Sequence, residues 1–266
     1  MRQAPEPHPR NRDFTWRPSQ APYTLLTAEQ AAQYDEAGYF LLEGAFTAAE
    51  MDAVAEAIAP FEAAAEQQLR DAGGQIAISK ADAITFTIHL VAQSASLKAF
   101  SRHAVFAGVC RDTLGPGARL YWDQAVYKKP GNPEEFPWHQ DNGYTFIEPQ
   151  QYLTCWVALN DATIDNGCPW VVPRLHRQGT FVHRVTPVGL QCLSDPEDAV
   201  AVPARKGDIV VFSSLTPHRT GPNLTGETRR AYILQYAPDG VLAFRRGEAA
   251  GRPQNDPTRQ FFVEGP

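Results

Sequence analysis

The chain has 266 residues, of which 43% are hydrophobic and 20% are charged, and its net charge is −6 at pH 7. This length allows one large domain with a sizeable core, and the composition is typical of a globular protein. A mildly acidic chain without a long apolar run is not expected to bind nucleic acid or a membrane. No apolar signal core follows Met1, so the expected location is the cytoplasm.

The four cysteines, Cys110, Cys155, Cys168 and Cys192, include no CxxC pair. Buried or unreactive thiols are therefore a better interpretation than a zinc site or a disulfide framework.

The N-terminal part predicts an extended arm followed by helices. Residues 1–22 are rich in proline and arginine and have no apolar period, which is typical of an arm. Thr27 with Gln30, and Thr47 with Glu50, form capping-box pairs, in which each side chain bonds the backbone N–H of the other residue. These pairs predict that one helix begins after Thr27 and another after Thr47.

Residues 23–117 are expected to form a mainly helical support. Pro60 interrupts the helical pattern that follows Thr47, and it is expected to kink or restart that helix. A short buried strand is predicted over 39–42, and one further helix over 96–114.

After residue 118 the pattern changes from helical to strand-like. Short runs rich in valine, isoleucine, threonine and aromatic residues alternate with glycine, proline and asparagine turns. Helices early and many short strands late predict helices packed on a β-sandwich or barrel. The predicted strands lie near Leu120–Lys128, Tyr152–Asn160, Trp170–Pro173, Thr180–Val185, Asp208–Ser213 and Arg230–Ala237.

Three residues form a candidate metal site. His139 and Asp141 are two residues apart on an extended segment, so their side chains point to the same face and can reach one ion. His218, which follows the predicted strand over 208–213, supplies a second imidazole. Two histidines and one carboxylate leave open positions on Fe(II) for a co-substrate and O2. Taken alone, the His139–Asp141 pair would be better explained by a solvent-exposed polar turn.

An arginine on the last predicted strand strengthens the metal hypothesis. Arg229 can present its planar guanidinium to a carboxylate and form two charge-assisted hydrogen bonds. A surface arginine would be the simpler interpretation, but iron and an inward arginine together could hold both ends of a keto dicarboxylate. Arg230 is the competing residue, and alternation along a strand lets only one of the two point inward.

Four segments that contain these residues resemble the phytanoyl-CoA dioxygenase family of Fe(II)/2-oxoglutarate-dependent oxygenases. They follow the family order and cover about residues 118–237. The resemblance implies a mainly β fold with flanking helices and a double-stranded β-helix core, which is a jelly-roll, cupin-like architecture. The segments are 124–131, then 138–141, then 155–162 together with 166–168 and 172–176, and finally 207–229.

The resemblance also implies a role for each of seven site residues. The metal ligands, which are also the catalytic residues, would be His139, Asp141 and His218. The residues that bind 2-oxoglutarate would be Arg229 and Thr220 at its distal carboxylate, Trp156 beside it, and Gln124 facing the pocket. The usual Pro-Gly-Ser-His turn of the family is replaced by Pro173-Arg174-Leu175-His176.

The implied activity is oxidation of a small or medium metabolite, with release of succinate and CO2. Hydroxylation is the expected outcome, while desaturation, epoxidation and cyclisation stay open, as do the substrate and the oligomeric state. Asp141 argues against a halogenase, which needs that coordination position for chloride. Two alternatives remain: a cupin-like metalloenzyme that does not use 2-oxoglutarate, and a non-catalytic metabolite-binding protein on the same fold.

The whole chain, residues 1–266, is expected to form a single oxygenase domain. Within it, 1–22 would be the arm, 23–117 the helical support, 118–240 the β-helix core and 241–266 a C-terminal tail.

Overall fold

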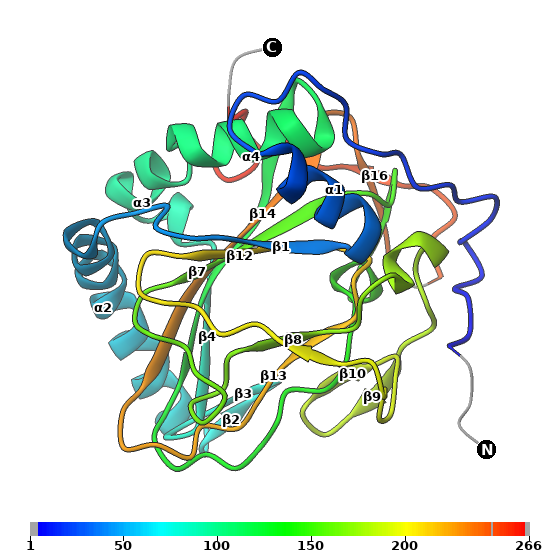
Figure 1. Ribbon diagram of the computed structural model, residues 1–266. Helices are drawn as coiled ribbons and strands as arrows, with labels where there is room; N and C mark the ends of the chain where they lie inside the picture. The colour runs from blue at the N-terminus through cyan, green and yellow to red at the C-terminus, as the bar shows by residue number, and fades with distance from the viewer. Residues whose placement is uncertain (1–4, 246, 264–266) are drawn as a thin grey trace.

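The computed structural model describes residues 5–245 and 247–263, so parts of the predicted arm (1–4) and tail (246, 264–266) lie outside the described residues. The arm follows the outside of the molecule and reaches α1 without forming a helix, and Pro7 pairs with Phe181 on the way (Figure 1). The helices are α1 (Ala28–Ala37), α2 (Ala48–Asp71), α3 (Ala95–Phe100) and α4 (Ala104–Leu114), and the short 3-10 turns are η1 (Leu90–Ala92), η2 (Asp141–Gly143) and η3 (Leu175–Gln178).

Both predicted capping boxes are present at the starts of α1 and α2. The predicted restart at Pro60 is wrong, because α2 runs through that proline without a break. A proline removes one backbone hydrogen bond, but the buried stripe that includes Met51 and Ile58 keeps the helix against the core. Burying each of those two side chains contributes roughly 1.5–3 kcal/mol.

The single helix predicted over 96–114 is also wrong, because the chain forms two helices there. α3 ends at Phe100, and the side chain of His103 then caps α4 by accepting a hydrogen bond from the N–H of Val105. A new cap at this point starts a second helix in a new direction.

Eight strands form one large sheet in the order β1-β12-β7-β14-β5-β4-β3-β2, and β11-β8-β13 form a smaller sheet. Of two further small sheets, one contains β10 and β9, and the other has the strand order β16-β15-β6. All strand pairs are antiparallel. The strands are β1 (Tyr39–Leu42), β2 (Gln75–Ile76), β3 (Ser79–Lys80), β4 (Ile84–Ile88), β5 (Ala118–Lys128), β6 (Phe146–Glu148), β7 (Leu153–Ala158), β8 (Pro169–Val171), β9 (Arg184–Thr186), β10 (Gly189–Gln191), β11 (Val200–Ala201), β12 (Ile209–Ser213), β13 (His218–Thr220), β14 (Arg229–Pro238), β15 (Leu242–Phe244) and β16 (Arg252–Pro253).

The long predicted strands are confirmed as β5, β7, β12 and β14, and the strand over 39–42 is confirmed as β1. The strand predicted over 180–185 is wrong for most of its length, since only its last two residues enter β9. The strand predicted over 170–173 ends early, at Val171. Pro173 and Arg174 form a turn there, in which Arg174 adopts a positive φ of 72°.

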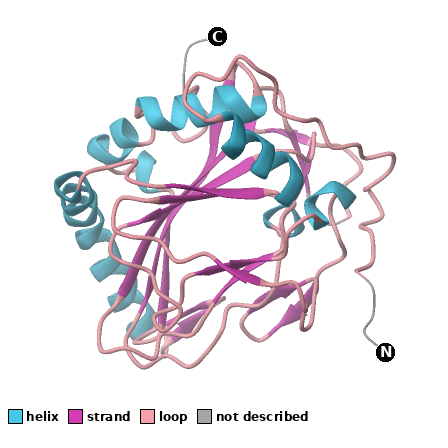
Figure 2. Cartoon of the chain, viewed as in Figure 1, coloured by secondary structure: helices cyan, strands magenta, loops and turns pink. Residues whose placement is uncertain are grey.

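The large sheet separates two layers (Figure 2). Its outer face packs against the helices through a core that includes Tyr127, Val157 and Tyr232. Alternate residues on the same strands, such as Trp156 and Ala231, pack on the inner face toward the small sheet. This alternation follows from the period of two along a strand. The inner face, between the two sheets, is therefore where side chains from distant strands meet.

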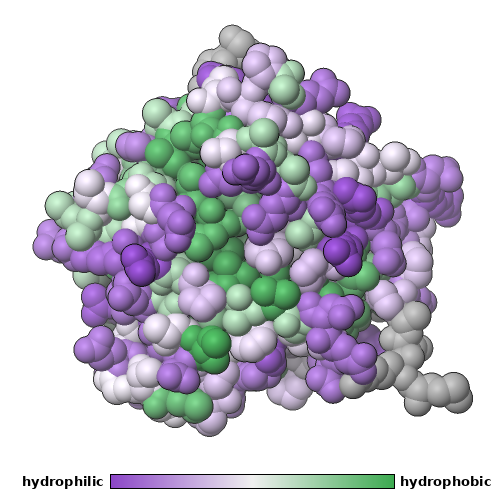
Figure 3. Space-filling view, viewed as in Figure 1, coloured by the Kyte–Doolittle hydropathy of each residue, from purple (hydrophilic) through white to green (hydrophobic). Residues whose placement is uncertain are grey.

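The arrangement is a jelly roll with flanking helices, as predicted, and its two main sheets face each other without closing into a barrel. The surface seen in Figure 3 is mostly polar, with a band of apolar side chains over α4 and β1. No helix in the described part of the chain is long and apolar enough to span a membrane. None of the four cysteines, all of which lie in that part, forms a disulfide.

Candidate metal and co-substrate site

His139 and His218 are brought together by the backbone. The two residues form an antiparallel bridge, in which each N–H donates to the carbonyl of the other at 2.9 and 2.8 Å. His218 begins β13, while His139 precedes the 3-10 turn η2 that carries Asp141. The pairing therefore places three side chains from two distant segments at one point on the inner face.

The donor atoms of the three residues face a common point. Asp141 Oδ1 lies 3.8 Å from His139 Nε2 and 3.7 Å from His218 Nε2, and the three donor atoms lie within 4.8 Å of one another. These distances are too long for hydrogen bonds between the side chains. They leave a space between one carboxylate and two imidazoles, which is a donor set that suits a first-row transition metal.

Both imidazoles are oriented by their second nitrogen. His139 Nδ1 lies 2.8 Å from the carbonyl of Pro137, and His218 Nδ1 lies 3.0 Å from the carbonyl of Thr216. A hydrogen on each Nδ1 leaves each Nε2 lone pair free for a metal. Burial lowers the pKa of His139 to about 3, with a further contribution from His218, and burial lowers the pKa of His218 to about 4. Both rings are thus neutral, as metal ligation requires.

Asp141 is held by side chains of the large sheet. Thr154 on β7 donates its hydroxyl to Asp141 Oδ2 at 2.5 Å, and Gln235 on β14 donates to Thr154 Oγ1 at 3.3 Å. Burial raises the pKa of Asp141, while His139, Thr154 and Gln235 oppose this shift. Such contacts set the orientation of a ligating carboxylate and leave its other oxygen, Oδ1, toward the two histidines.

Gln140 is a positioning residue that the sequence did not single out. It stands between two candidate ligands, and its fully buried side chain points to the opposite side. Its Nε2 donates to the carbonyls of Gly179 and Leu215 at 2.9 and 2.6 Å, and its Oε1 accepts from the N–H of Phe181 at 2.6 Å. Alternation predicts this direction, but nothing in a lone glutamine indicates the three partners.

The four residues predicted for the co-substrate lie on the large sheet or, in the case of Thr220, on the facing strand β13. Trp156 on β7 is opposite Ile233 on β14, and Ile233 is opposite Gln124 on β5, so these side chains form one row across the sheet. Gln124 is half-buried, and its Oε1 accepts a hydrogen bond from Trp122 Nε1 at 3.3 Å. Thr220 lies two residues after His218 at the end of β13 and is also half-buried.

Arg229 is completely buried and lacks an anionic partner. Its guanidinium carbon lies 5.3 Å from the ring centre of Trp156, and its Nη1 donates to the carbonyl of Val126 at 3.2 Å. Its Nε and Nη2 are buried and make no hydrogen bond to the described residues. Burial lowers its pKa to about 10. Arg230, by contrast, is exposed, as alternation along the strand requires.

A buried guanidinium with free N–H groups is unfavourable unless a ligand completes it. Its guanidinium lies against Trp156, which is two residues along β7 from the Thr154 that holds Asp141, and this position fits an anion that also reaches the metal. The geometry therefore offers a metal centre and a separate carboxylate site that open into one interior.

The comparisons with known proteins agree with this arrangement. The family model described as phytanoyl-CoA dioxygenase (PhyH) matches residues 34–231. Methylphosphonate hydroxylase of Gimesia maris is 36% identical over 124 residues, and phytanoyl-CoA dioxygenase of Arabidopsis thaliana is 30% identical over 115 residues. These alignments cover 46% and 41% of each protein, so the chain spans less than half the length of these curated relatives.

Among solved structures, EctD from S. alaskensis with 2-oxoglutarate and 5-hydroxyectoine has a TM-score of 0.70 at 23% identity. The superposition covers 94% of this chain and 89% of that chain, which shows a shared fold.

The fold and the site together define a jelly-roll protein with a buried group of two histidines and one aspartate, suited to a divalent metal. The family match covers most of the chain and includes all three of those residues. The chain belongs to the phytanoyl-CoA dioxygenase (PhyH) family.

Proposed function

We propose that the chain is an Fe(II)- and 2-oxoglutarate-dependent dioxygenase, with iron held by His139, Asp141 and His218. The observation that carries this proposal is the combination of a three-residue metal group with the buried guanidinium of Arg229, whose Nε and Nη2 have no hydrogen-bond partner among the described residues. A metal site alone would suit many cupin-like enzymes. A buried arginine with two free N–H positions in the same interior supports a co-substrate that carries a second carboxylate, away from its keto acid end.

The bound iron, 2-oxoglutarate and O2 would supply the oxidation: one oxygen atom enters succinate as CO2 leaves, and the other oxidises the substrate, typically by converting a C–H bond to C–OH. The protein residues would position the reactants. His139 and His218 would bind through Nε2, since each Nδ1 is hydrogen-bonded to a carbonyl. Asp141 would bind through Oδ1, with Thr154 holding Oδ2.

The remaining site residues would hold the co-substrate. Arg229 would pair with the distal carboxylate through Nε and Nη2, and the hydroxyl of Thr220 would donate a further hydrogen bond. Trp156 would form an apolar wall that excludes water and strengthens the ion pair at Arg229. Gln124, in the same row of the sheet, would face the co-substrate from β5.

The substrate is proposed to be a small or medium metabolite that enters beside the metal ligands. Phe136 and Tyr144 stand against His139, with ring centres at 4.9 and 5.4 Å, so they are positioned to contact a substrate over the metal. Aromatic side chains with a few polar groups are typical of small-molecule pockets. The relatives' names point to different substrates, including methylphosphonate and ectoine, so they suggest a screening panel.

We further propose that the chain works as one oxygenase unit in the cytoplasm. Residues of the helical support pack directly on the outer face of the sheet that carries the site. This packing supports the single-domain prediction, and the location stays a prediction from the sequence.

The test is succinate formation from 2-oxoglutarate in the presence of Fe(II), ascorbate and O2, measured with a panel of small metabolites. Wild-type protein should form succinate, and a true substrate should accelerate it and appear with one added oxygen. His139→Ala and Arg229→Ala should abolish or strongly reduce succinate formation, while Arg230→Ala should leave it unchanged. Iron binding without succinate in any condition would instead favour a cupin-like enzyme that does not use 2-oxoglutarate, or a non-catalytic binding protein.

A further inference from the structure

The interior between the sheets is open beside β5. Trp122 on β5 lies opposite Gln235 on β14, and Gln235 lies opposite Thr154, the residue that holds Asp141. Residues that are directly opposed across a sheet share a face, so Trp122 points into the same interior as the metal ligands. Trp122 is nevertheless only half-buried, whereas Arg229 is completely buried. Solvent therefore reaches the interior through an opening at Trp122, the β5 opening.

A β-bulge turns a second aromatic residue toward this opening. The register between β5 and β14 shifts where Gln235 is followed by Tyr236, and Tyr121 is the extra residue on β5. Bulges re-aim side chains and are frequent beside active sites. Burial raises the pKa of Tyr121, with Asp141 acting in the same direction and Arg259 against it. Tyr121 therefore lies within electrostatic reach of both a metal ligand and Arg259.

Arg259 reaches the β5 opening from the C-terminal segment. This segment is tied to β5, because the N–H of Leu120 donates to the carbonyl of Phe261 at 3.0 Å. Arg259 Nε donates to Asp256 Oδ2 at 3.1 Å, and Arg259 Nη1 lies 2.7 Å from His89 Nε2, to which it donates. A guanidinium has five N–H groups, so three of them remain without a hydrogen-bond partner among the described residues.

His89 holds this arginine beside Trp122. It directly follows β4, whose last residue lies opposite Gln124 on β5, and its φ of 57° is uncommon for a residue other than glycine. The His89 ring packs edge to face on the Trp122 ring, with ring centres 4.3 Å apart. Trp122 Nε1 in turn donates to Gln124 Oε1 at 3.3 Å. These contacts join Arg259 to Gln124, which is one of the candidate co-substrate residues.

We infer that Arg259 binds an anionic group of the substrate, and that this group is a carboxylate or a phosphonate. The inference rests on the proposed function and adds the chemical class of the substrate. Either anion can accept two parallel, charge-assisted hydrogen bonds from one guanidinium. The half-buried rings of Trp122 and Tyr121 would cover the apolar part of the substrate, between its anionic group and the carbon that is oxidised.

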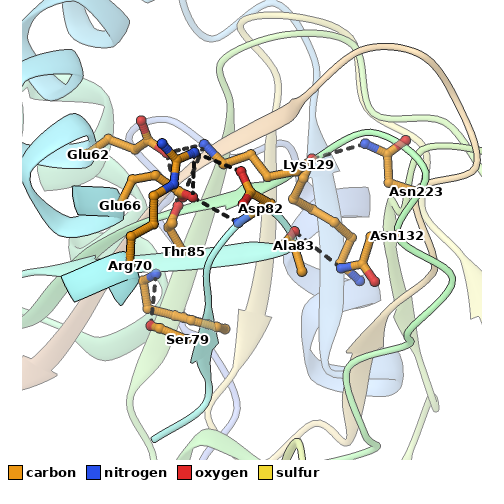
Figure 4. Close-up of polar contacts among 12 residues, drawn as sticks. Glu62, Glu66, Arg70, Ser79, Asp82, Ala83, Thr85, Lys129, Asn132 and Asn223 are labelled. Atoms are coloured by element: carbon orange, nitrogen blue, oxygen red, sulfur yellow. Dashed lines mark hydrogen bonds and ion pairs between the residues drawn. The ribbon is translucent and has the colours of Figure 1, made fainter. Parts of the chain in front are cut away.

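Two other arginines serve as matched controls for Arg259. Arg252 lies in the same C-terminal segment and pairs with Glu248 at 2.6 Å. Arg70 belongs to helix α2 and pairs with Asp82 at 2.7 Å, outside the interior (Figure 4). The side chains of Arg252 and Arg70 are 58% and 53% exposed. Replacing either arginine with methionine removes one positive charge and one ion pair, as Arg259→Met does, but leaves the β5 opening unchanged.

The experiment is calorimetric titration of the Mn(II)-loaded protein, first with 2-oxoglutarate and then, at saturating 2-oxoglutarate, with four probes. Saturation keeps the probes away from Arg229. Hexanoate and pentylphosphonate carry the two anions, and hexanamide and dimethyl pentylphosphonate are their neutral counterparts. Circular dichroism and the melting temperature check that each variant is folded.

Wild type, Arg252→Met and Arg70→Met should bind at least one anion about tenfold or more tightly than its neutral counterpart. Arg259→Met should lose this preference and should bind 2-oxoglutarate as wild type does. Preference for hexanoate alone would identify a carboxylate substrate, and preference for pentylphosphonate alone would identify a phosphonate substrate.

Three results would overturn the inference and leave the proposed function intact. Wild type could bind each anion no more tightly than its neutral counterpart, or bind neither anion measurably. These two results come from wild type alone, so they decide the matter even if Arg259→Met does not fold. The third result is an anion preference that survives in folded Arg259→Met, which would leave Arg259 only the role of tying the C-terminal segment to His89. A wild type that does not bind 2-oxoglutarate in the first titration would instead overturn the proposed function, and the inference with it.

Discussion

Replacing Gln140 with alanine should destabilise the protein and weaken metal binding together. The side chain makes three buried hydrogen bonds of 2.6–2.9 Å, to Gly179, Leu215 and Phe181. Its loss leaves a buried N–H and two carbonyls without that partner and creates a small cavity. Each buried group left without a partner costs about 1–3 kcal/mol, and the cost is smaller for the two carbonyls because they can find other partners. The free energy of unfolding should therefore fall by about 3–5 kcal/mol.

The same change should reduce metal affinity by about 10- to 100-fold, because Gln140 fixes the segment that carries His139 and Asp141. Urea unfolding of the metal-free protein and titration with Mn(II) measure the two effects separately. Gln178→Ala is the matched control, since Gln178 is an exposed glutamine on a neighbouring turn and should change neither quantity. A loss below about 1 kcal/mol with unchanged Mn(II) affinity would refute the positioning role.

Three further changes test other parts of the account. Arg174→Gly should raise the free energy of unfolding by about 0.5–1 kcal/mol, because the residue has a φ of 72°, and a lower urea midpoint would contradict this. Thr154→Val should weaken Mn(II) binding about tenfold with an unchanged circular dichroism spectrum, because it removes the 2.5 Å hydrogen bond to Asp141; unchanged affinity would exclude that role. Burial raises the pKa of Asp123 from 3.8 to about 6, so its ionisation opposes folding above that range. Asp123→Asn should therefore raise the free energy of unfolding by about 1–2 kcal/mol at pH 8, by less between pH 6 and 4, and by nothing below about pH 3.8. An increase that is the same at every pH would rule out ionisation of Asp123 as its cause.

The elements predicted correctly are those with strong local signals. The capping boxes at Thr27 and Thr47 determine where two helices begin, and the apolar runs of β7 and β12 are buried on both faces. The strands that were missed, such as β2 and β16, have two exposed residues each and exist only because a partner strand lies beside them. Pairing of this kind is decided by the fold and leaves little trace in the local sequence.

The site shows the same division. The spacing of His139 and Asp141, and a histidine after a buried strand, predicted a group that the structure brings together. Alternation allowed only one of two neighbouring arginines to point inward, the spacing from His218 favoured Arg229, and the structure buries Arg229. Gln140 was not singled out, because its importance depends on which backbone groups surround it after folding.

The most direct test of the account is the visible absorption spectrum of the protein with Fe(II) and 2-oxoglutarate under anaerobic conditions. Wild type should show a metal-to-ligand charge-transfer band, His139→Ala should lose it, and Arg229→Ala should show a weaker band at limiting 2-oxoglutarate. Arg230→Ala should match wild type. Iron binding without such a band, at any concentration of 2-oxoglutarate, would contradict the central claim that iron and 2-oxoglutarate meet at this site.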